Sequence, residues 1–401
     1  MEIIRIFEHD DTIANMIALF RVELGTYKSL VKELNIEAAK EELLEYINSN
    51  YPVYACKIED TYAGYMVLRI DGGVVWVESI YVKEEYRRKG VCSALYKEAE
   101  KVAESYNEDT VYNYVHPNNH KMIEFLKAIL FGIVEGITEW LPVSSTGHLI
   151  LLDEFIRLDV TEAFYEMFQV VIQLGAILAV VVLFFHKLNP FSPKKNQVQK
   201  KDTWSLWFKV VVAVIPSAVI GLVLDDWMDA HLYNYVVVAI MLIVYGVAFL
   251  FVEKWNASRN FKISDVNAID YKTALLMGAF QCLSLIPGTS RSGSTILGAI
   301  ILGVSRSAGA EFSFFMAIPT MLGASGLKLL KYALDIKDGL SAAPNGTEIM
   351  VLAVGCVVSF LVSVAVIRGL MEYVRKHSFS VFGVYRIVLG LLVLGYFLIV
   401  R

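Results

Sequence analysis

The chain has 401 residues, of which 56% are hydrophobic, and its mean hydropathy is +0.52. This composition is too apolar for one ordinary soluble domain. Residues 1–126 carry 22 acidic and 14 basic side chains, whereas residues 127–401 carry 19 acidic and 22 basic ones. We therefore expect a soluble acidic domain at 1–126 and an integral membrane domain at 127–401. The four cysteines are widely spaced, a pattern that predicts neither a zinc site nor a disulfide framework.

The first domain has the patterns of a small α/β fold. Strand-like runs occur at 51–57, 62–70 and 74–82, and helical periodicity occurs at 11–24, 36–48 and 91–105. The last of these helices follows a basic turn that contains Gly90. Free amides at a helix N-terminus, together with the helix dipole, favour phosphate. The turn therefore predicts an anion site.

The segment around this turn, Arg87-Arg88-Lys89-Gly90-Val91-Cys92, resembles the acetyl-CoA-binding segment of GNAT-type N-acetyltransferases. The resemblance covers about residues 1–126 and implies that acetyl-CoA is bound at Arg87, Arg88, Gly90 and Cys92. Cys92 replaces a small residue of the family pattern, and Leu126 stands where the family has a tyrosine general acid. The chain becomes apolar at Lys127, where the family's last two strands would follow. The resemblance thus implies a truncated domain, and a membrane-tethered N-acetyltransferase is one alternative function.

The second domain contains six apolar stretches long enough to span a bilayer. They lie near 165–185, 206–224, 233–252, 308–328, 348–367 and 381–400. Two further apolar stretches, 127–157 and 273–303, are broken by Pro, Gly and polar residues. Because irregular backbone at membrane depth must be satisfied by protein or by a water-filled cavity, we expect both to form re-entrant helical hairpins. Each hairpin precedes three spans, which predicts an inverted repeat and keeps a transporter of an anionic or lipid substrate as an alternative.

Basic residues between the spans predict the orientation. The segments 186–209 and 368–386 are rich in Lys and Arg and are expected to be cytoplasmic. The segment 225–234 carries three aspartates and no Lys or Arg, and is expected to lie outside. A hairpin at 127–157 would then place residues 1–126 outside as well.

Two polar cassettes occupy the breaks of the hairpins. The first, Glu135-Gly-Ile-Thr-Glu139-Trp-Leu-Pro-Val-Ser-Ser-Thr-Gly-His148, places two carboxylates one helical turn apart. Ionisable groups at bilayer depth are functional candidates. Two adjacent carboxylates in a low dielectric need a cation, which predicts Mg²⁺ or Ca²⁺ shared with a phosphate. The alternative is a protonated carboxyl in an interhelical hydrogen bond.

The second cassette, Pro287-Gly-Thr-Ser-Arg291-Ser-Gly-Ser-Thr295, has a guanidinium in an apolar segment. Arg291 predicts a bound phosphate, since its planar fork matches phosphate oxygens, and the alternative is an ion pair with Glu135 or Glu139. His148 or Ser145 could be the nucleophile or the base, and the sequence does not choose between them. The hydroxyl and amide donors expected to cradle phosphate are those of Ser144, Thr146, Ser290, Ser292, Ser294 and Thr295.

Together, the two cassettes resemble the motifs of the bacterial undecaprenyl-diphosphate phosphatase family, and the resemblance covers 127–401. It implies release of the terminal phosphate of undecaprenyl diphosphate, which returns undecaprenyl phosphate as the cell-wall lipid carrier and confers bacitracin resistance. It implies a divalent cation at Glu135 and Glu139, and phosphate binding by Arg291 and Ser290 with support from Thr295. The expected protein is multi-pass in the bacterial plasma membrane. Its expected partners are a polyprenyl diphosphate and the bilayer, without nucleic acid, and a homodimer is left open.

Overall fold

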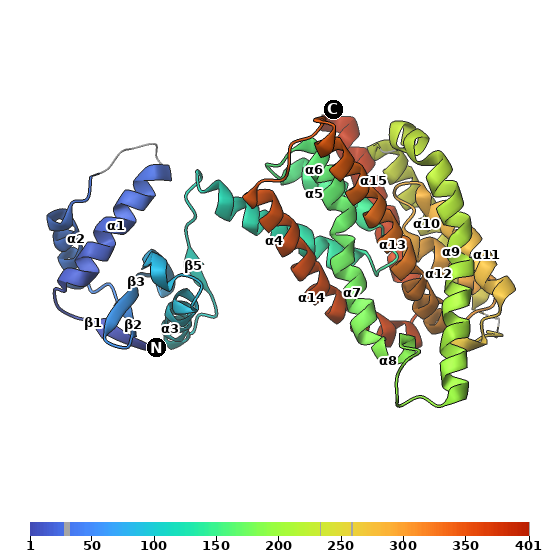
Figure 1. Cartoon of the computed structure of the whole chain (residues 1–401), viewed down its shortest axis with the longest axis horizontal. Coiled ribbons are helices and arrows are strands. Elements are labelled where there is room, and N and C mark those ends of the chain that lie inside the picture. The colour runs from blue at the N-terminus through green and yellow to red at the C-terminus, as the bar shows by residue number, and fades with distance from the viewer. Residues whose placement is uncertain (28–32, 233, 258–259, 401) are drawn as a thin grey trace. The chain divides into compact units, whose positions relative to one another are not determined.

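The computed structural model describes residues 1–27, 33–232, 234–257 and 260–400 (Figure 1). The chain divides into two compact units, Met1–Ile123 and Glu124–Arg401, which are described one at a time.

The N-terminal unit is a small α/β domain. Among the described residues, five strands form one sheet in the order β1-β2-β3-β4-β5, antiparallel except for the parallel pair β4-β5. The strands are β1 (Glu2–Ile6), β2 (Val53–Ile58), β3 (Thr61–Asp71), β4 (Val74–Val82) and β5 (Val111–Asn113). The helices are α1 (Asp11–Tyr27), α2 (Ile36–Asn48) and α3 (Val91–Ser105), with a short 3₁₀ turn η1 (Glu84–Tyr86). One apolar core lies between the sheet and α1 with α2, and the other lies between the sheet and α3.

The three strands and three helices expected in this unit are confirmed, whereas β1 and β5 were not predicted. β1 is short and has no strict alternation of charged and apolar residues, and β5 has only three residues. Strands this short are specified by their pairing with β2 and β4 rather than by their own pattern.

Helix α4 (His120–Thr138) runs without a break. The end of the first domain, expected at 126, and the first arm of the hairpin expected at 127–157 therefore lie in one continuous helix. The predicted division at 126/127 lies within it. The apolar periodicity that begins at Lys127 continues that of the preceding turns, and the segment contains no proline that would end the helix.

The membrane unit is helical, and the part of the chain that the structure describes holds six helices long and apolar enough to cross a membrane. This confirms the six expected spans. They are α6–α7 (Glu162–Val171 and Gln173–Leu183), α9 (Gln197–Leu232), α10 (Tyr235–Asn256), α13 (Arg306–Lys337), α14 (Gly346–Lys376) and α15 (Ser380–Val400). A four-residue helix, α8 (Phe185–Leu188), follows α7, and the 3₁₀ turn η2 (Val266–Ala268) precedes the second hairpin. α9 includes most of the segment 225–234, whose Tyr233 and aspartate side chains lie outside the described residues.

Each broken stretch forms two helices, as expected. The first pair is α4 and α5 (Ser145–Phe155). The second pair is α11 (Tyr271–Cys282) and α12 (Arg291–Ile301), with a 3₁₀ turn η3 (Leu283–Leu285) between them.

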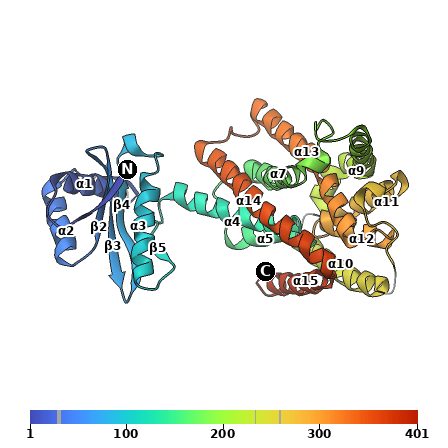
Figure 2. The same ribbon diagram turned by 90° about the horizontal axis from the view of Figure 1, so that it is seen from below.

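The two halves of the membrane unit interlock. A Cβ at Gly132 of α4 would meet the carbonyl oxygen of Gly355 on α14 at 2.8 Å. A Cβ at Gly278 of α11, 146 positions later, would meet the carbonyl oxygen of Ala213 on α9 at 1.9 Å. Both glycines therefore permit backbone contact between a hairpin of one half and a long helix of the other. α10 also packs along α15, its counterpart in the second half (Figure 2).

Candidate functional site

Both cassette breaks have the same local geometry. Ser144 and Ser290 precede α5 and α12, and both have positive φ, 75° and 73°. Each serine caps its helix, because Ser144 Oγ accepts from the Gly147 amide at 3.3 Å and Ser290 Oγ accepts from the Gly293 amide at 3.1 Å. A left-handed non-glycine residue costs of order 1 kcal/mol or more. The side-chain cap offsets part of this cost and satisfies one of the main-chain amides at each helix N-terminus.

The two cassettes meet at Glu139. Ser145 Oγ donates to Glu139 Oε2 at 2.5 Å, and Arg291 Nη2 donates to Glu139 Oε1 at 3.1 Å. Arg291 Nη1 also donates to the carbonyl of Ser313 on α13 at 2.9 Å. The guanidinium carbon lies 5.7 Å from the centre of the Trp140 ring. One carboxylate therefore orients a hydroxyl from one break and a guanidinium from the other, and Arg291 has the ion pair that the sequence left as an alternative.

The electrostatics of this cluster are balanced only in part. Glu139 is 5% exposed and is compensated by Arg291. Glu135, one turn earlier on α4, is fully buried, and neither of its carboxyl oxygens has a hydrogen-bond partner among the described residues. A buried carboxyl without a partner needs either a proton or a cation.

The remaining hydroxyls of the second cassette tie the site together. Ser292 Oγ lies 3.2 Å from the carbonyls of both Glu139 and Leu141. Thr295 Oγ1 donates to the Arg291 carbonyl at 2.8 Å, and its distance to Ser313 Oγ is 2.5 Å. Ser294 Oγ donates to the same carbonyl at 3.1 Å. Ser292 therefore fixes the break of α4–α5 against α12, whereas Ser294 and Thr295 bond within α12 and Thr295 also joins α12 to α13.

Ser290 and Thr146 take different places. Ser290 Oγ lies 3.2 Å from Ser292 Oγ in addition to capping α12. Thr146 is half-buried in the first turn of α5. Both residues therefore lie at helix N-termini, where main-chain amides can meet an anion.

His148 lies one turn into α5, and its described partners are Ser144 and Tyr385. Its Nδ1 lies 2.7 Å from the carbonyl oxygen of Ser144, and its Nε2 lies 2.7 Å from the hydroxyl of Tyr385 on α15. A carbonyl can only accept, so Nδ1 carries the proton and Nε2 accepts from Tyr385. Tyr385 was missed from the sequence, since its distance of 237 positions from His148 gives no local signal.

Arg386, the next residue on α15, was also missed. Arg386 is the last basic residue of the segment 368–386, which is expected to be cytoplasmic, and the structure places it within α15, fully buried. Its Nη1 donates to the carbonyl of Pro142 at 3.0 Å, and its Nη2 donates to the carbonyl of Gly288 at 2.7 Å. These two acceptors occupy the same place in the two cassettes, 146 positions apart. An arginine within an apolar run was the available signal.

The N-terminal unit has a separate candidate anion site at the turn before α3. Arg88 and Gly90 both have positive φ, 62° and 85°, and α3 begins without a side-chain cap. Free amides therefore point out of this turn, beside the exposed Cys92. The guanidinium of Arg87 is held by the carboxylate of Glu23 on α1, at 2.9 Å.

A metal would find few ligands in the protein itself. Among the described residues, no group of three His, Cys, Asp or Glu side chains is placed to hold an ion. The unpartnered oxygens of Glu135 nevertheless fit a hard divalent cation, and Glu139 lies one turn away. Mg²⁺ is commonly held by one or two carboxylates together with substrate phosphates, so these residues fit a metal–phosphate complex.

Comparison with known proteins separates the two units. Residues 18–130 match the acetyltransferase (GNAT) family, in agreement with the resemblance of the first domain. Residues 128–392 match the family described as bacitracin resistance protein BacA.

Similar curated proteins match about two thirds of the chain over nearly all of their own length. A protein of Limosilactobacillus fermentum named undecaprenyl-diphosphatase is 58% identical over 276 residues, which is 69% of this chain and 98% of the relative. Proteins of the same name from Enterococcus faecalis and Streptococcus thermophilus are each 58% identical, and the matches cover 97% and 94% of these relatives and 68% and 69% of this chain. The chain therefore belongs to the bacitracin resistance protein BacA family.

Proposed function

We propose that the membrane unit hydrolyses the terminal phosphate of undecaprenyl diphosphate and releases undecaprenyl phosphate and inorganic phosphate. The observation that carries this proposal is the convergence of Ser145 and Arg291, from two separate breaks, on the single carboxylate of Glu139. The reaction returns the lipid carrier to cell-wall synthesis and confers resistance to bacitracin. The names of the relatives and the family match favour this hydrolysis over the transporter and the tethered acetyltransferase.

The protein is a multi-pass membrane protein of bacteria, with its six spans in the unit that carries the site. Its partners in this function are the polyprenyl diphosphate and the surrounding bilayer. A homodimer remains a further proposal. The close glycine contacts lie within one membrane unit and do not specify a contact between two copies.

Ser145 is the nucleophile that the geometry favours. Its Oγ attacks the terminal phosphorus, its proton passes to Glu139, and the bond to undecaprenyl phosphate breaks, which leaves phosphoserine for hydrolysis by water. Arg291 turns from Glu139 to the phosphate oxygens as the carboxylate is protonated, and stabilises the charge that develops there. His148 is the second candidate for nucleophile or base, and its Nε2 must first leave the hydroxyl of Tyr385.

Glu135 and Glu139 are the residues we propose to hold a divalent cation, with Mg²⁺ preferred to Ca²⁺. The protein offers two carboxylates, and Ca²⁺ takes six to eight oxygen ligands whereas Mg²⁺ is satisfied by few carboxylates with phosphate and water. When bound, such a cation neutralises charge on the diphosphate. We propose that Ser144 and Thr146 at α5, and Ser290 and Ser292 at α12, contribute main-chain amides to phosphate binding, with Thr295 in support because it holds the first turn of α12 against α13.

For the N-terminal unit, we propose binding of acetyl-CoA at the turn that contains Arg87, Arg88, Gly90 and Cys92, without transfer of the acetyl group. The free amides of the turn support binding, and Leu126 in place of a general acid argues against transfer. Calorimetry with the full chain tests this. A lack of acetyl-CoA binding refutes the site, and acetylation of an amine refutes the restriction to binding.

The experiment that tests the phosphatase measures phosphate release from undecaprenyl diphosphate by the purified full chain. Turnover by the wild type is expected, together with its loss in Arg291→Ala and Glu139→Gln. Arg368 and Glu372 are exposed on α14, so Arg368→Ala and Glu372→Gln are matched controls that should keep full activity. Tight binding of the lipid diphosphate without any turnover would sink the phosphatase and leave the transporter.

A further inference from the structure

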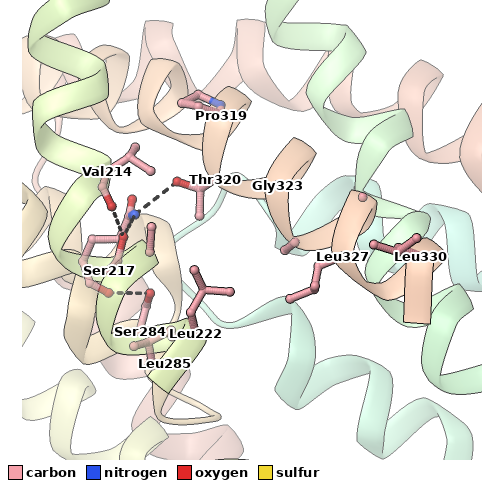
Figure 3. A pocket seen from close by; sticks show the side chains of 15 residues that line it. Val214, Ser217, Leu222, Ser284, Leu285, Pro319, Thr320, Gly323, Leu327 and Leu330 are labelled. Atoms are coloured by element: carbon pink, nitrogen blue, oxygen red, sulfur yellow. Dashed lines mark hydrogen bonds between the residues drawn. The ribbon is translucent and has the colours of Figure 1, made fainter. Parts of the chain in front are cut away.

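A cavity lies beside Gln281 in the membrane unit, apart from the cluster around Glu139. Its volume is about 550 Å³, and it is enclosed by α9, by the end of α11 with η3, and by α13 (Figure 3). Leu222 and Leu330 on its rim are 69% and 58% exposed. Because both lie on spanning helices, the cavity opens toward lipid. Its volume is within the usual range for small-molecule sites.

This cavity is an uncharged counterpart of the phosphatase site. Gln281 occupies the place of Glu135 in the repeat, and Leu285 occupies that of Glu139. All fifteen residues that line the cavity belong to the described part of the chain, and none of them carries an ionisable side chain. A phosphate at bilayer depth needs cations or a cluster of donors, so the cavity does not suit a phosphorylated head group.

The polar wall of the cavity consists of acceptors. Ser217, Ser284 and Thr320 lie on the same side of it in Figure 3, opposite Leu327 and Leu330. Each of the three hydroxyl protons is already given to a main-chain carbonyl, that of Val214, Gln281 and Met316 respectively.

The buried amide of Gln281 supports this wall from behind. Its Nε2 donates to Ser217 Oγ at 2.7 Å and to Thr320 Oγ1 at 3.2 Å. Its Oε1 is buried and has no hydrogen-bond partner among the described residues. A ligand that meets this wall must donate a hydrogen bond, which excludes the ester carbonyls of a phospholipid as the recognised group.

We propose that this cavity binds a lipid alcohol of the polyprenol class, with its hydroxyl at Ser284 and Thr320. The apolar walls take the chain, and the acceptors take the hydroxyl proton. The choice of a polyprenyl chain rests on the proposed function, whereas the choice of an uncharged hydroxyl rests on the wall itself.

Gly323 provides the variant that tests the cavity. It lines the cavity, and an added Cβ there meets no atom within 4 Å. Gly323→Leu therefore fills the space without a clash inside a helix that tolerates leucine. Gly369 on α14 also has open space around its Cβ and lies outside the cavity, so Gly369→Leu is the matched control.

The measurement is equilibrium binding of a radiolabelled polyprenol to the full chain in phospholipid nanodiscs. The wild type and Gly369→Leu should bind alike. Gly323→Leu should bind about tenfold or more weakly, since displacing two methylene groups of the chain is enough for that loss. Thr320→Val, which keeps the shape but removes one acceptor, should weaken binding about two- to tenfold.

Competition distinguishes the head groups. Unlabelled polyprenol should displace the label, whereas polyprenyl phosphate, which is charged, and polyprenyl acetate, which has no donor, should displace it at least about tenfold less well. Equal competition by either lipid overturns the proposal, as does unchanged binding by Gly323→Leu.

Phosphate release separates this inference from the proposed function. Gly323→Leu should hydrolyse undecaprenyl diphosphate at the wild-type rate, and a loss of hydrolysis in this variant overturns the assignment of a second site. A wild-type chain that binds polyprenol here but releases no phosphate would refute the phosphatase alone.

Discussion

The side chain of Arg386 binds equivalent carbonyls in both cassettes, and replacement of Arg386 by methionine removes these bonds. Methionine preserves much of the volume but none of the donors. The guanidinium makes two well-formed bonds, to the carbonyls of Gly288 at 2.7 Å and Pro142 at 3.0 Å. Hydrogen bonds of a charged donor contribute about 1.5–3 kcal/mol each, so the two together represent about 3–6 kcal/mol.

This loss should appear both in stability and in catalysis. We expect the thermal unfolding midpoint of Arg386→Met in detergent to fall, and kcat for phosphate release to fall by about a hundredfold or more, because the two breaks lose their fixed spacing. KM should change much less, since Arg386 is fully buried and does not reach the lipid. Arg386→Lys keeps the charge and one or two donors, and should recover part of both quantities.

Arg368→Met is the control, because Arg368 is exposed on α14 and its loss should leave stability and activity unchanged. An Arg386→Met variant that unfolds at the wild-type temperature and has the wild-type kcat would refute the positioning role of Arg386. A fall in stability with a normal kcat of the folded fraction would also refute it, since Arg386 would then support the fold without positioning the site.

Four further outcomes test the site. Arg291→Lys should lower kcat at least about a hundredfold in a phosphate-release assay, because an ammonium cannot reproduce the planar fork. Ser145→Ala should lower kcat at least about a thousandfold, and wild-type phosphoserine trapped by acid quench should be absent from the variant. Tyr385→Phe should leave kcat nearly unchanged, because Ser145 and Glu139 carry the attack and His148 Nε2 loses only a bond that it would have to release to act as a base, so a large fall in kcat would refute a role for Tyr385 outside the reaction. EDTA should stop phosphate release and added Mg²⁺ restore it, while circular dichroism stays unchanged.

The sequence was sufficient for the features that depend on local pattern. The six spans follow from length and hydropathy, and both hairpin breaks follow from proline and glycine inside apolar stretches. The pairing of Arg291 with Glu139 was among the stated alternatives, because a buried guanidinium and a buried carboxylate in one apolar unit need each other.

Contacts between distant segments could not be predicted from the sequence. Nothing in the run from Ser380 to Val400 says that Tyr385 meets His148, or that Arg386 reaches carbonyls in both cassettes. Arg386 was assigned to a loop because basic residues at span ends are usually read as orientation signals. The same rule could not distinguish an arginine that ends a loop from one that begins the buried face of α15.

The roles of the cassette hydroxyls also required coordinates. A serine or threonine in such a motif can cap a helix, bind a carbonyl or face a ligand, and composition does not separate these uses. Ser144 and Ser290 cap, Ser292 and Thr295 bind carbonyls or a neighbouring hydroxyl, and Ser145 alone donates to Glu139.

The repeat explains why the chain keeps similar backbone in both halves but different side chains. The capped left-handed serine recurs at Ser144 and Ser290, and Arg386 satisfies the equivalent carbonyls of Pro142 and Gly288. Charge does not recur, since Glu135 of the first half is matched by Gln281 of the second. Two buried carboxylates beside one arginine leave a negative site that a cation can complete. A second set of carboxylates would lack such an arginine, because Ser145 stands in the place of Arg291. One catalytic site per repeat pair is therefore what burial and charge balance permit, and the neutral half is free to hold an uncharged lipid.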